Sequence, residues 1–595
     1  MLHPSCLSLL LAALSGAVAS AFDQAQFMPR SGIAQAATDV PSPIVDLGYS
    51  QYQGFYNSTV NWNVYRGIRF AAPPKRFQLP EPPAISRDKV FPALNDPPRC
   101  PQTPSGPMPT GAVNFEASIQ GSEDCLFLNV FAPPNATKLP VAVWIHGGGY
   151  GVGSANSFDY GHIAKTVNNG MVIVQIQYRI GAFGFLSSAE IAKHGTLNTG
   201  VHDMVFALEW VQKYIKLFGG DPNEVTISGE SAGGGAVMLM AMANGGTEGT
   251  RLFKRGIASS PYYPTQPKFF DSLPEEYYRQ FARRANCLDA NATVLPSDGS
   301  VFKCLQNADT LLLQNASAWT SYSGKNGQWA FIPVTDGTLL REQPEVQLLK
   351  GKVNGESVLS AANANEATYF IKQNITSSAD FVSLLHLLYP HLAKTPRPLY
   401  NRLLELYAVP ASFPANLTAA QRFDTDGLHP PFATTMSAYA SGWQQAANNL
   451  YAETTFVCSA YWLADAYAIA GKTAWRYQFS IPNAFHGSDL TALQRDPVGI
   501  ASLRYDADFQ WGFQNIWGRY VVGGVPTLEG RLPAGLAAGA EWSWKPWGAG
   551  GKYELLNVNV TDTKPVKANL SVVDAMAFEG GRGERCKLWA EIGFR

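Results

Sequence analysis

The pentapeptide Gly229-Glu230-Ser231-Ala232-Gly233 decides the fold of this chain. It follows the short β-branched run 225–227 and precedes a small, apolar, helix-compatible segment that extends through Met242. A serine between glycines at a strand-to-helix turn is typical of a nucleophile elbow, in which the tight turn exposes the hydroxyl above a helix N-terminus. The same pattern also occurs in ordinary turns, so the interpretation of Ser231 as a nucleophile depends on its surroundings.

A glycine-rich segment upstream supports this interpretation. The apolar run 141–145 predicts a buried strand and leads directly into His146-Gly147-Gly148-Gly149, the pattern from which α/β-hydrolases supply oxyanion-hole amides. Glycines let backbone N–H groups approach the negative oxygen of a tetrahedral intermediate without a Cβ in the way. We expect Gly148, Gly149 and Ala232 to be the donors. The alternative is a flexible hairpin loop.

Several further segments resemble the type-B carboxylesterase/lipase family, the cholinesterase-like branch of the α/β-hydrolases. They are 65–70, 123–130, 178–186 and 218–222. The resemblance is dense from Tyr65 to Pro261 and continues in islands as far as Cys586. It implies an α/β-hydrolase fold, with a large, mostly parallel central β-sheet flanked by helices and interrupted by long insertions. It also implies an enzyme that hydrolyses carboxylic esters.

Hydrophobic periodicity agrees with an α/β fold. Apolar runs at 141–145, 171–177, 225–227 and 473–479 predict strands, and the helical stretches between them indicate a mainly parallel sheet. The clearest helix is expected over 201–218, because its apolar residues recur at three- and four-residue spacing and Gly219 follows as a stop.

A serine nucleophile requires a base, and in this fold the order along the chain is serine, acid, histidine. Four histidines follow Ser231, namely His386, His391, His429 and His486. The first two lie in a leucine-rich helical stretch, and the third precedes two prolines in a loop. His486 lies in the segment 485–490, which matches the catalytic-histidine loop of the family. The resemblance therefore assigns the base to His486.

The orienting acid is expected between the serine and the histidine. The segment 363–370 resembles the family segment in which a glutamate fills this role, which indicates Glu366, although Asn365 and Ala367 depart from the usual pattern. Asp336 resembles a structural turn of the family. Glu230 is similar to a buried glutamate of the family that either tunes the histidine or holds the loops near the elbow.

Composition excludes several other classes of function. The net charge is −1 with 15% charged residues, so the chain lacks the electrostatic footprint of a protein that binds nucleic acid or an anionic membrane. No CxxC or histidine spacing indicates a zinc site. Acyl transfer through a triad needs no cofactor and no metal. We expect a small-molecule ester as the partner, and the sequence does not indicate an oligomeric state.

The N-terminus predicts a secretory signal over residues 1–20, with an apolar core at 7–14 followed by small residues. Its first residues contain no Lys or Arg, which departs from the usual pattern. A transmembrane anchor is the alternative, but the run is shorter than the ~18 apolar residues needed to span a bilayer. We expect a secreted, extracellular protein without a stable membrane anchor, in which residues 21–595 form a single domain.

Cysteines and glycosylation sequons agree with secretion. Beyond residue 20 the chain keeps six cysteines, and the resemblance pairs Cys100 with Cys125, Cys287 with Cys304, and Cys458 with Cys586. Eight Asn-x-Ser/Thr sequons predict glycosylated surface loops. They are Asn57, Asn135, Asn291, Asn315, Asn374, Asn416, Asn559 and Asn569.

The loop between Cys100 and Cys125 bears on the substrate. Cholinesterases place a tryptophan there to bind a quaternary ammonium, but residues 101–124 contain none. The loop is rich in Pro and Gly, with few large apolar groups for an amphipathic lid. These features favour a short-acyl or aromatic-ester carboxylesterase over a lipase for long-chain acylglycerols. A non-catalytic adhesion or binding homologue is a third alternative.

If the protein is an enzyme, we expect its activity to fall below roughly pH 6 to 7, because His486 is then protonated.

Overall fold

The computed structural model describes residues 42–108, 120–292, 294–324, 327–410, 436–437, 440–481, 484–494, 505, 507–528, 544–563 and 566–593. The predicted signal segment 1–20, the sequon at Asn416 and His429 lie outside these residues.

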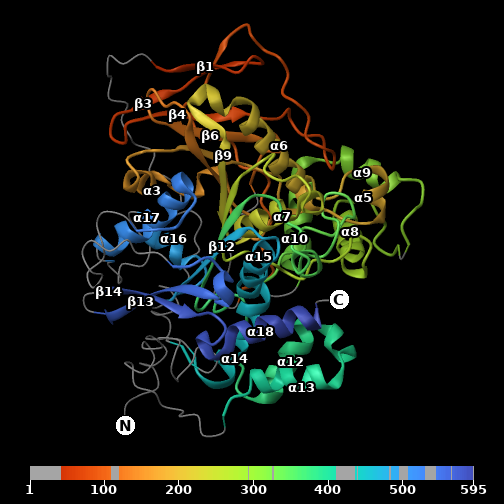
Figure 1. Ribbon diagram of the computed structural model, residues 1–595. Helices are drawn as coiled ribbons and strands as arrows, with labels where there is room; N and C mark the ends of the chain where they lie inside the picture. Colours follow the sequence, from red (N-terminus) through yellow and green to blue (C-terminus); the bar gives the residue numbers. More distant parts are fainter. Residues whose placement is uncertain are drawn as a thin grey trace, which may run out of the picture.

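A large central sheet organises the described residues (Figure 1). Its eleven strands lie in the order β14-β13-β12-β11-β10-β9-β7-β8-β6-β4-β3. Pairing is parallel from β13 to β8 and antiparallel at both edges. The strands are β3 (Phe55–Asn57), β4 (Trp62–Arg69), β6 (Phe127–Ala132), β7 (Leu139–Ile145), β8 (Val172–Ile176), β9 (Gly220–Glu230), β10 (Arg255–Ser259), β11 (Ser357–Asn363), β12 (Thr473–Phe479), β13 (Glu554–Thr563) and β14 (Val566–Asp574).

Helices cover both faces of this sheet, which gives the mostly parallel α/β-hydrolase architecture that the sequence predicts. A small second sheet joins β1 (Ile44–Asp46), β2 (Gln51–Gln53) and β5 (Val90–Pro92). The α-helices are α3 (Gly161–Thr166), α4 (Gly181–Phe185), α5 (Ala189–His194), α6 (Thr199–Tyr214), α7 (Ala232–Gly246), α8 (Ser272–Arg284), α9 (Ser300–Asn307), α10 (Thr310–Tyr322), α11 (Pro344–Leu348), α12 (Ser378–Leu388), α13 (Arg397–Leu406), α14 (Gly442–Ala452), α15 (Cys458–Ile469), α16 (Ser488–Leu493), α17 (Ala507–Gly523) and α18 (Phe578–Ile592). A π-helical turn, Glu453–Val457, separates α14 from α15.

The two faces of the sheet belong to two separate hydrophobic cores. On β7, Val143 belongs to the core that includes residues of α6, α7 and α15, whereas Trp144 belongs to the core that includes residues of α3 and α17. Successive side chains of a strand point to opposite faces. Because both faces are covered, the central strands are apolar throughout rather than alternating, as the run at 141–145 predicts.

The predicted elements and the observed ones agree closely, with small differences at their ends. The strand expected at 225–227 is longer, because β9 begins at Gly220. The helix expected over 201–218 is α6 followed by a 3-10 turn, Ile215–Phe218, and it stops at Gly219 with a φ of 82°. Left-handed φ values are accessible to glycine without steric strain, which is why this residue ends the helix.

Three disulfides join the described cysteines. They are Cys100–Cys125, Cys287–Cys304 and Cys458–Cys586. This is the pairing that the family resemblance implies. The third bond joins segments 128 residues apart and fastens α18 to the start of α15.

The sequons predict surface loops, and several of the described ones lie elsewhere. Asn559 lies in β13 with only 7% of its surface exposed, so the folded protein has no room for a glycan there. Asn315 is exposed but lies within α10, and Asn569 lies in β14. Asn57 ends β3 and is partly buried. Asn135, Asn291 and Asn374 are exposed in turns or loops, as expected.

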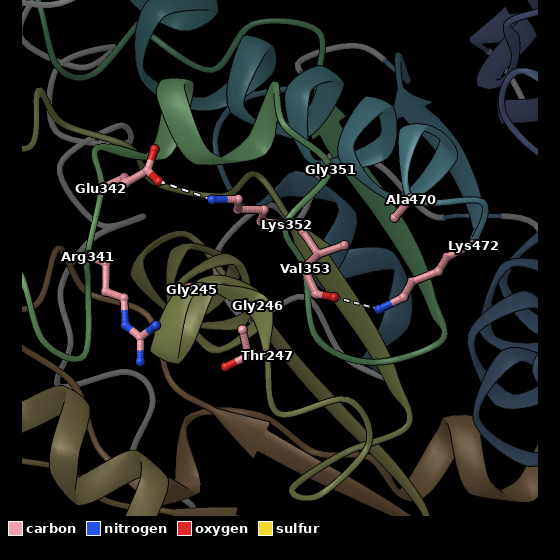
Figure 2. A pocket seen from close by; sticks show the side chains of 10 residues that line it. All are labelled: Gly245, Gly246, Thr247, Arg341, Glu342, Gly351, Lys352, Val353, Ala470 and Lys472. Carbon is pink, nitrogen blue, oxygen red and sulfur yellow. Dashed lines mark hydrogen bonds and ion pairs between the residues drawn. The ribbon is translucent and has the colours of Figure 1, made fainter.

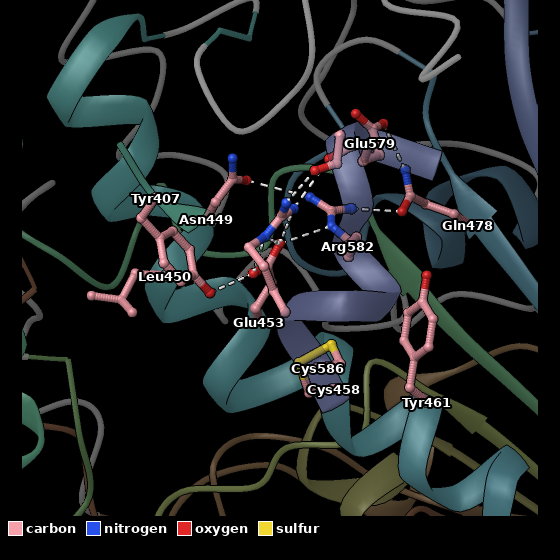
Figure 3. A network of polar contacts seen from close by, with 12 residues as sticks. Tyr407, Asn449, Leu450, Glu453, Cys458, Tyr461, Gln478, Glu579, Arg582 and Cys586 are labelled. Atoms are coloured by element: carbon pink, nitrogen blue, oxygen red, sulfur yellow. Dashed lines mark hydrogen bonds and ion pairs between the residues drawn. A yellow bond between two sulfur atoms is a disulfide. The ribbon is translucent and has the colours of Figure 1, made fainter. Parts of the chain in front are cut away.

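A buried ionic cluster, Glu453 with Arg582 and Arg585, fastens the π-helical turn to α18 (Figure 3). Arg585 Nη2 donates to Glu453 Oε1 at 2.7 Å, and Tyr407 Oη donates to Glu453 Oε2 at 2.5 Å. Arg582 also donates to Gln478 of β12 at 2.6 Å. Burial alone would raise the pKa of Glu453, but the charge of Arg585 and its hydrogen bonds hold that pKa below its ordinary value.

We predict that Arg585→Leu lowers the free energy of unfolding by about 3–5 kcal/mol, because it leaves the buried Glu453 carboxylate without its main partner. Denaturant unfolding with the disulfides intact measures this loss. Arg251→Leu is the control, since Arg251 pairs with Glu209 and Glu248 while about half exposed, and each surface pair is worth about 1 kcal/mol or less. Equal losses in both variants would contradict the assignment of the cluster as a structural anchor.

Candidate active site

Ser231 occupies a strained turn between β9 and α7. Its φ is 61° and its ψ −125°, a backbone conformation that non-glycine residues rarely adopt and that is typical of a nucleophile elbow. Flanking glycines are required because a Cβ at Gly229 would overlap the backbone of Gly233, and one at Gly233 would overlap the Ile145 carbonyl. Ser231 N donates to Ser259 O at 3.1 Å, which holds the strained residue against β10.

Two neighbouring strands carry the predicted acid and base to the same place. β11 and β12 pair in parallel with Asn363 opposite Phe479, and beyond their ends Asn365 forms an isolated bridge with Phe485. The next residues in the two loops are Glu366 and His486. His486 Nδ1 donates to Glu366 Oε2 at 2.5 Å.

A buried set of donors fixes the carboxylate of Glu366. Glu366 has no exposed surface, and its Oε1 accepts from Ser260 Oγ at 2.6 Å and from Asn363 N at 2.5 Å. Ser260 follows β10 directly, so the strand beside the elbow also supports the acid. With Oε1 held in this way, Oε2 is directed at the imidazole of His486.

The other imidazole nitrogen lies at the elbow, next to Glu230. His486 Nε2 is 3.2 Å from Glu230 Oε1. Within the described residues no hydrogen bond joins His486 to the Ser231 hydroxyl, so the direct serine–histidine contact expected of a triad is absent from this state. Glu230 directly precedes Ser231 in the chain, so Nε2 lies in the region of the elbow. Catalytic hydrogen bonds are often long without substrate and shorten only in the substrate complex.

Opposing effects set the proton affinities at the elbow. Burial alone would lower the pKa of His486, but the negative charges of Glu230 and Glu366 raise it to about 9. Burial raises the pKa of Glu230 to about 8, against the opposing effect of His486. The two groups are in contact and titrate together. The imidazole therefore holds its proton more strongly than free histidine does.

The glycine-rich loop lies against the nucleophile. A Cβ at Gly147 would stand 3.1 Å from Ser231 Cβ, while Gly148 and Gly149 have φ values of 103° and 63°. The N–H groups of Gly148, Gly149 and Ala232 donate to no other described residue. The structure thus brings the three predicted donors and the nucleophile into one region.

An aromatic shell surrounds these groups, and sequence reasoning did not find it. The ring of Phe456 lies 4.2 Å from the imidazole of His486, and that of Phe370 lies 5.3 Å away. Tyr262 packs on both Phe456 and Trp329, and a Cβ at Gly149 would overlap the Trp329 indole. These rings come from four separate segments. No local sequence signal connects them, although Phe456 lies in the π-helical turn, a feature frequent at functional sites.

Comparison with known proteins identifies the family of the chain. The sequence profile of the carboxylesterase family matches residues 41–568. The chain belongs to the carboxylesterase family. Carboxylesterase 1E of Rattus norvegicus is 33% identical over 345 residues, which cover 54% of this chain and 59% of that protein. Secreted lipase 4 of Gibberella zeae is 29% identical over 61% of this chain and 62% of its own. The aligned regions thus span less than two thirds of these relatives.

A solved structure extends the likeness over most of the fold. EstA of Aspergillus niger superposes with a TM-score of 0.71 at 25% identity, covering 92% of this chain and 98% of that one. The similarity in fold therefore reaches well beyond the segments that align in sequence.

Other candidate residues have structural roles in this member of the carboxylesterase family. Asp336 forms a turn, accepting from Thr338 N at 2.7 Å and from Asn198 Nδ2 at 2.6 Å. His386 contacts the hydroxyl of Tyr400, and His391 contacts a backbone carbonyl. Across the described residues, no three His, Cys, Asp or Glu side chains are grouped so as to hold a metal ion.

A cleft of about 400 Å³ lies away from the candidate site, at the C-terminal end of α7 (Figure 2). Ser231 precedes the opposite end of this helix, roughly 20 Å away at 1.5 Å per residue. The lining cations already have partners, since Lys352 lies 3.5 Å from Glu342 and Lys472 donates to the carbonyl of Val353. None of the candidate catalytic residues lines this cleft.

We predict that Glu230→Gln shifts the acid limb of the kcat/KM–pH profile to lower pH by about one unit or more. The base acts only as neutral imidazole, and removing a neighbouring negative charge lowers the pKa of His486. In the unaltered enzyme the raised pKa places this limb above the pH of 6 to 7 expected from sequence alone. The matched control is Glu230→Asp, which keeps the charge and should shift the limb less. Superimposable profiles for all three proteins would count against His486 as the base.

We also predict that Gly149→Ala lowers kcat by about 10²-fold, because the new Cβ overlaps Trp329 and displaces an oxyanion-hole amide. Gly523→Ala is the control, since a Cβ there meets nothing within 4 Å. Steady-state hydrolysis of a dissolved ester measures both variants. An unchanged kcat in Gly149→Ala would contradict the assignment of this loop to the oxyanion hole.

Proposed function

We propose that this protein is a secreted serine carboxylesterase that acts through Ser231, His486 and Glu366. The single observation that carries the proposal is the 2.5 Å hydrogen bond from His486 to the buried Glu366, made beside a serine in the strained elbow conformation. This combination of an oriented imidazole, a serine in a strained turn and free amides suits acyl transfer.

In the proposed mechanism, the Ser231 hydroxyl attacks the ester carbonyl while His486 Nε2 takes its proton. Glu366 holds the imidazole in the tautomer that leaves Nε2 free to accept and stabilises the imidazolium that forms. The amides of Gly148, Gly149 and Ala232 bind the oxyanion of the tetrahedral intermediate. The alcohol leaves with the proton from His486, and water then releases the acyl group by the same steps. None of these steps requires a cofactor or a metal.

Glu230 tunes the base in this proposal, because its carboxyl group faces His486 Nε2, the nitrogen that takes the proton of Ser231. When substrate binds, Nε2 must exchange its contact with Glu230 for one with Ser231. A negative Glu230 then stabilises the imidazolium, while a protonated Glu230 stabilises it less. The buried carboxyl therefore adjusts how readily the base accepts its proton.

The substrate class that we favour is a short-acyl or aromatic ester. The rings of Phe370, Phe456, Tyr262 and Trp329 surround the elbow and suit an apolar or aromatic ester group. Residues 101–124 contain no tryptophan for a quaternary ammonium. The similarity to a secreted lipase supports long-chain acylglycerols as the second candidate. A non-catalytic adhesion role is not favoured, because the serine, acid and base are all retained.

Secretion rests on sequence and on the disulfides. Residues 1–20 have the pattern of a signal segment, and three disulfides join the described cysteines, which suits an oxidising compartment. None of the described helices is long and apolar enough to cross a bilayer. We propose that residues 21–595 act as a single secreted domain.

We predict that Ser231→Ala lowers the rate of hydrolysis of a chromogenic butyrate ester by about 10⁴-fold or more, because it removes the proposed nucleophile. Ser297→Ala, at an exposed position, is the control and should keep the full rate. Comparable rates for both variants would defeat the proposed function. A sharp rise in rate at the surface of a long-chain triglyceride emulsion, absent with dissolved esters, would favour the lipase alternative.

A further inference from the structure

The glycine-rich loop fixes one of its own carbonyl groups. Gly148 O accepts from Gly151 N at 3.0 Å and from Val152 N at 2.9 Å. The next amide, Gly149 N–H, belongs to the same peptide unit as Gly148 O. A trans peptide unit is planar, so its C=O and N–H point in opposite directions. The two hydrogen bonds on the carbonyl therefore turn the Gly149 amide, a proposed oxyanion donor, away from the inside of the loop.

The loop depends on support from outside, because several of its residues have left-handed backbone angles. Gly148, Gly149 and Gly153 have φ values of 103°, 63° and 118°, and Tyr150, which carries a side chain, has a φ of 62°. Such a conformation persists only where the surrounding structure holds it. The contacts that hold residues 151–153 from outside therefore decide where the Gly149 amide points.

A neighbouring segment of the chain supplies these contacts. Thr103 N donates to Gly151 O at 2.6 Å. The side-chain amide of Gln102 pairs with both backbone groups of Gly153, since its Oε1 accepts from Gly153 N at 2.7 Å and its Nε2 donates to Gly153 O at 3.1 Å. The side chain of Gln102 thus takes the place that a paired strand would have beside this part of the loop.

Gln102 is itself tied to the central sheet. It is only 1% exposed, and its Nε2 also donates to Cys100 O at 2.7 Å. Cys125, the disulfide partner of Cys100, lies just before β6. Without the Gln102 amide, the buried N–H and C=O of Gly153 would lose these partners, which is costly away from water. One side chain therefore connects the disulfide and the sheet to the glycine-rich loop.

We propose that Gln102 is a positioning residue of the oxyanion hole, which aims the Gly149 N–H through its two hydrogen bonds to Gly153. The proposal rests on the function proposed above, because an oxyanion forms only if Ser231 attacks an ester. An oxyanion donor stabilises the transition state more than the bound substrate. A displaced Gly149 amide therefore lowers kcat and leaves KM nearly unchanged.

The test compares two buried glutamines next to the same disulfide. Gln102→Met keeps a side chain of similar length and removes its hydrogen bonds. Gln177→Met is the matched control, since Gln177 is also 1% exposed and its Nε2 donates to Pro98 O and Cys125 O, both at 2.8 Å. Neither of these bonds leads to the glycine-rich loop. We expect similar falls in the thermal midpoint for both variants, because each loses the bonds of one buried amide.

Steady-state hydrolysis of a dissolved butyrate ester separates the two roles. We expect kcat to fall about tenfold or more in Gln102→Met with KM within about twofold, and kcat to stay within about twofold in Gln177→Met. An alkyl trifluoromethyl ketone adds to the serine and places an oxyanion in the hole. Its inhibition constant should rise in Gln102→Met by the same factor by which kcat/KM falls. Equal kcat in the two variants, or a change in KM alone, would overturn the proposal.

If Gln102→Met does not fold, Gln102→Asn keeps a polar amide at this position that is one methylene too short to reach Gly153, and the same loss of kcat is expected. If neither variant folds while Gln177→Met does, the role of Gln102 is structural and the proposal is overturned. Failure of the proposed function is seen separately, as a Ser231→Ala variant that keeps the full rate. Where Ser231→Ala is inactive, an unchanged kcat in the Gln102 variants refutes the positioning role alone.

Discussion

Parallel strand pairing is the constraint on which the site depends. From β13 to β8 the neighbouring strands run in one direction, so their carboxyl ends meet at one edge of the sheet. The glycine-rich loop follows β7, Ser231 follows β9, and the loops of Glu366 and His486 follow β11 and β12. In open α/β sheets ligands bind outside these ends. A slip of one residue in any of these pairs would turn the side chains to the other face and disperse the site.

Burial makes electrostatics strong at the elbow. The imidazole of His486 lies between two carboxyl groups, with Nδ1 hydrogen-bonded to Glu366 and Nε2 3.2 Å from Glu230, and aromatic rings pack against it. Charges in such surroundings interact far more strongly than in water. The raised pKa of His486 follows from this arrangement. In the proposed acyl transfer, the same arrangement would place the imidazolium between the carboxyl groups of Glu366 and Glu230.

Helix α18 supports the segment that packs against His486. Cys586 and the two arginines of α18 hold the segment Glu453–Cys458, and Phe456 of that segment packs on His486. Arg582 also bonds Gln478 of β12, the strand that leads into the His486 loop. A covalent bond and a buried ionic cluster thus act on the same few residues. This explains why the base is held by elements that are remote from it in sequence.

The sequence by itself determined the fold class, the elbow with Ser231 and the glycine-rich loop, because local backbone demands and hydrophobic periodicity are written in consecutive residues. Glu366 and His486 became candidates through the resemblance to a known family. The contact of Glu230 with His486, the aromatic shell and the cluster around Glu453 appear only in the tertiary structure. Each joins residues that no spacing rule connects. Burial also distinguishes accessible sequons from inaccessible ones: Asn559 and Asn315 satisfy the same motif, but only Asn315 is exposed. Local pattern therefore specified which groups are present, and strand register and burial decided which of them meet.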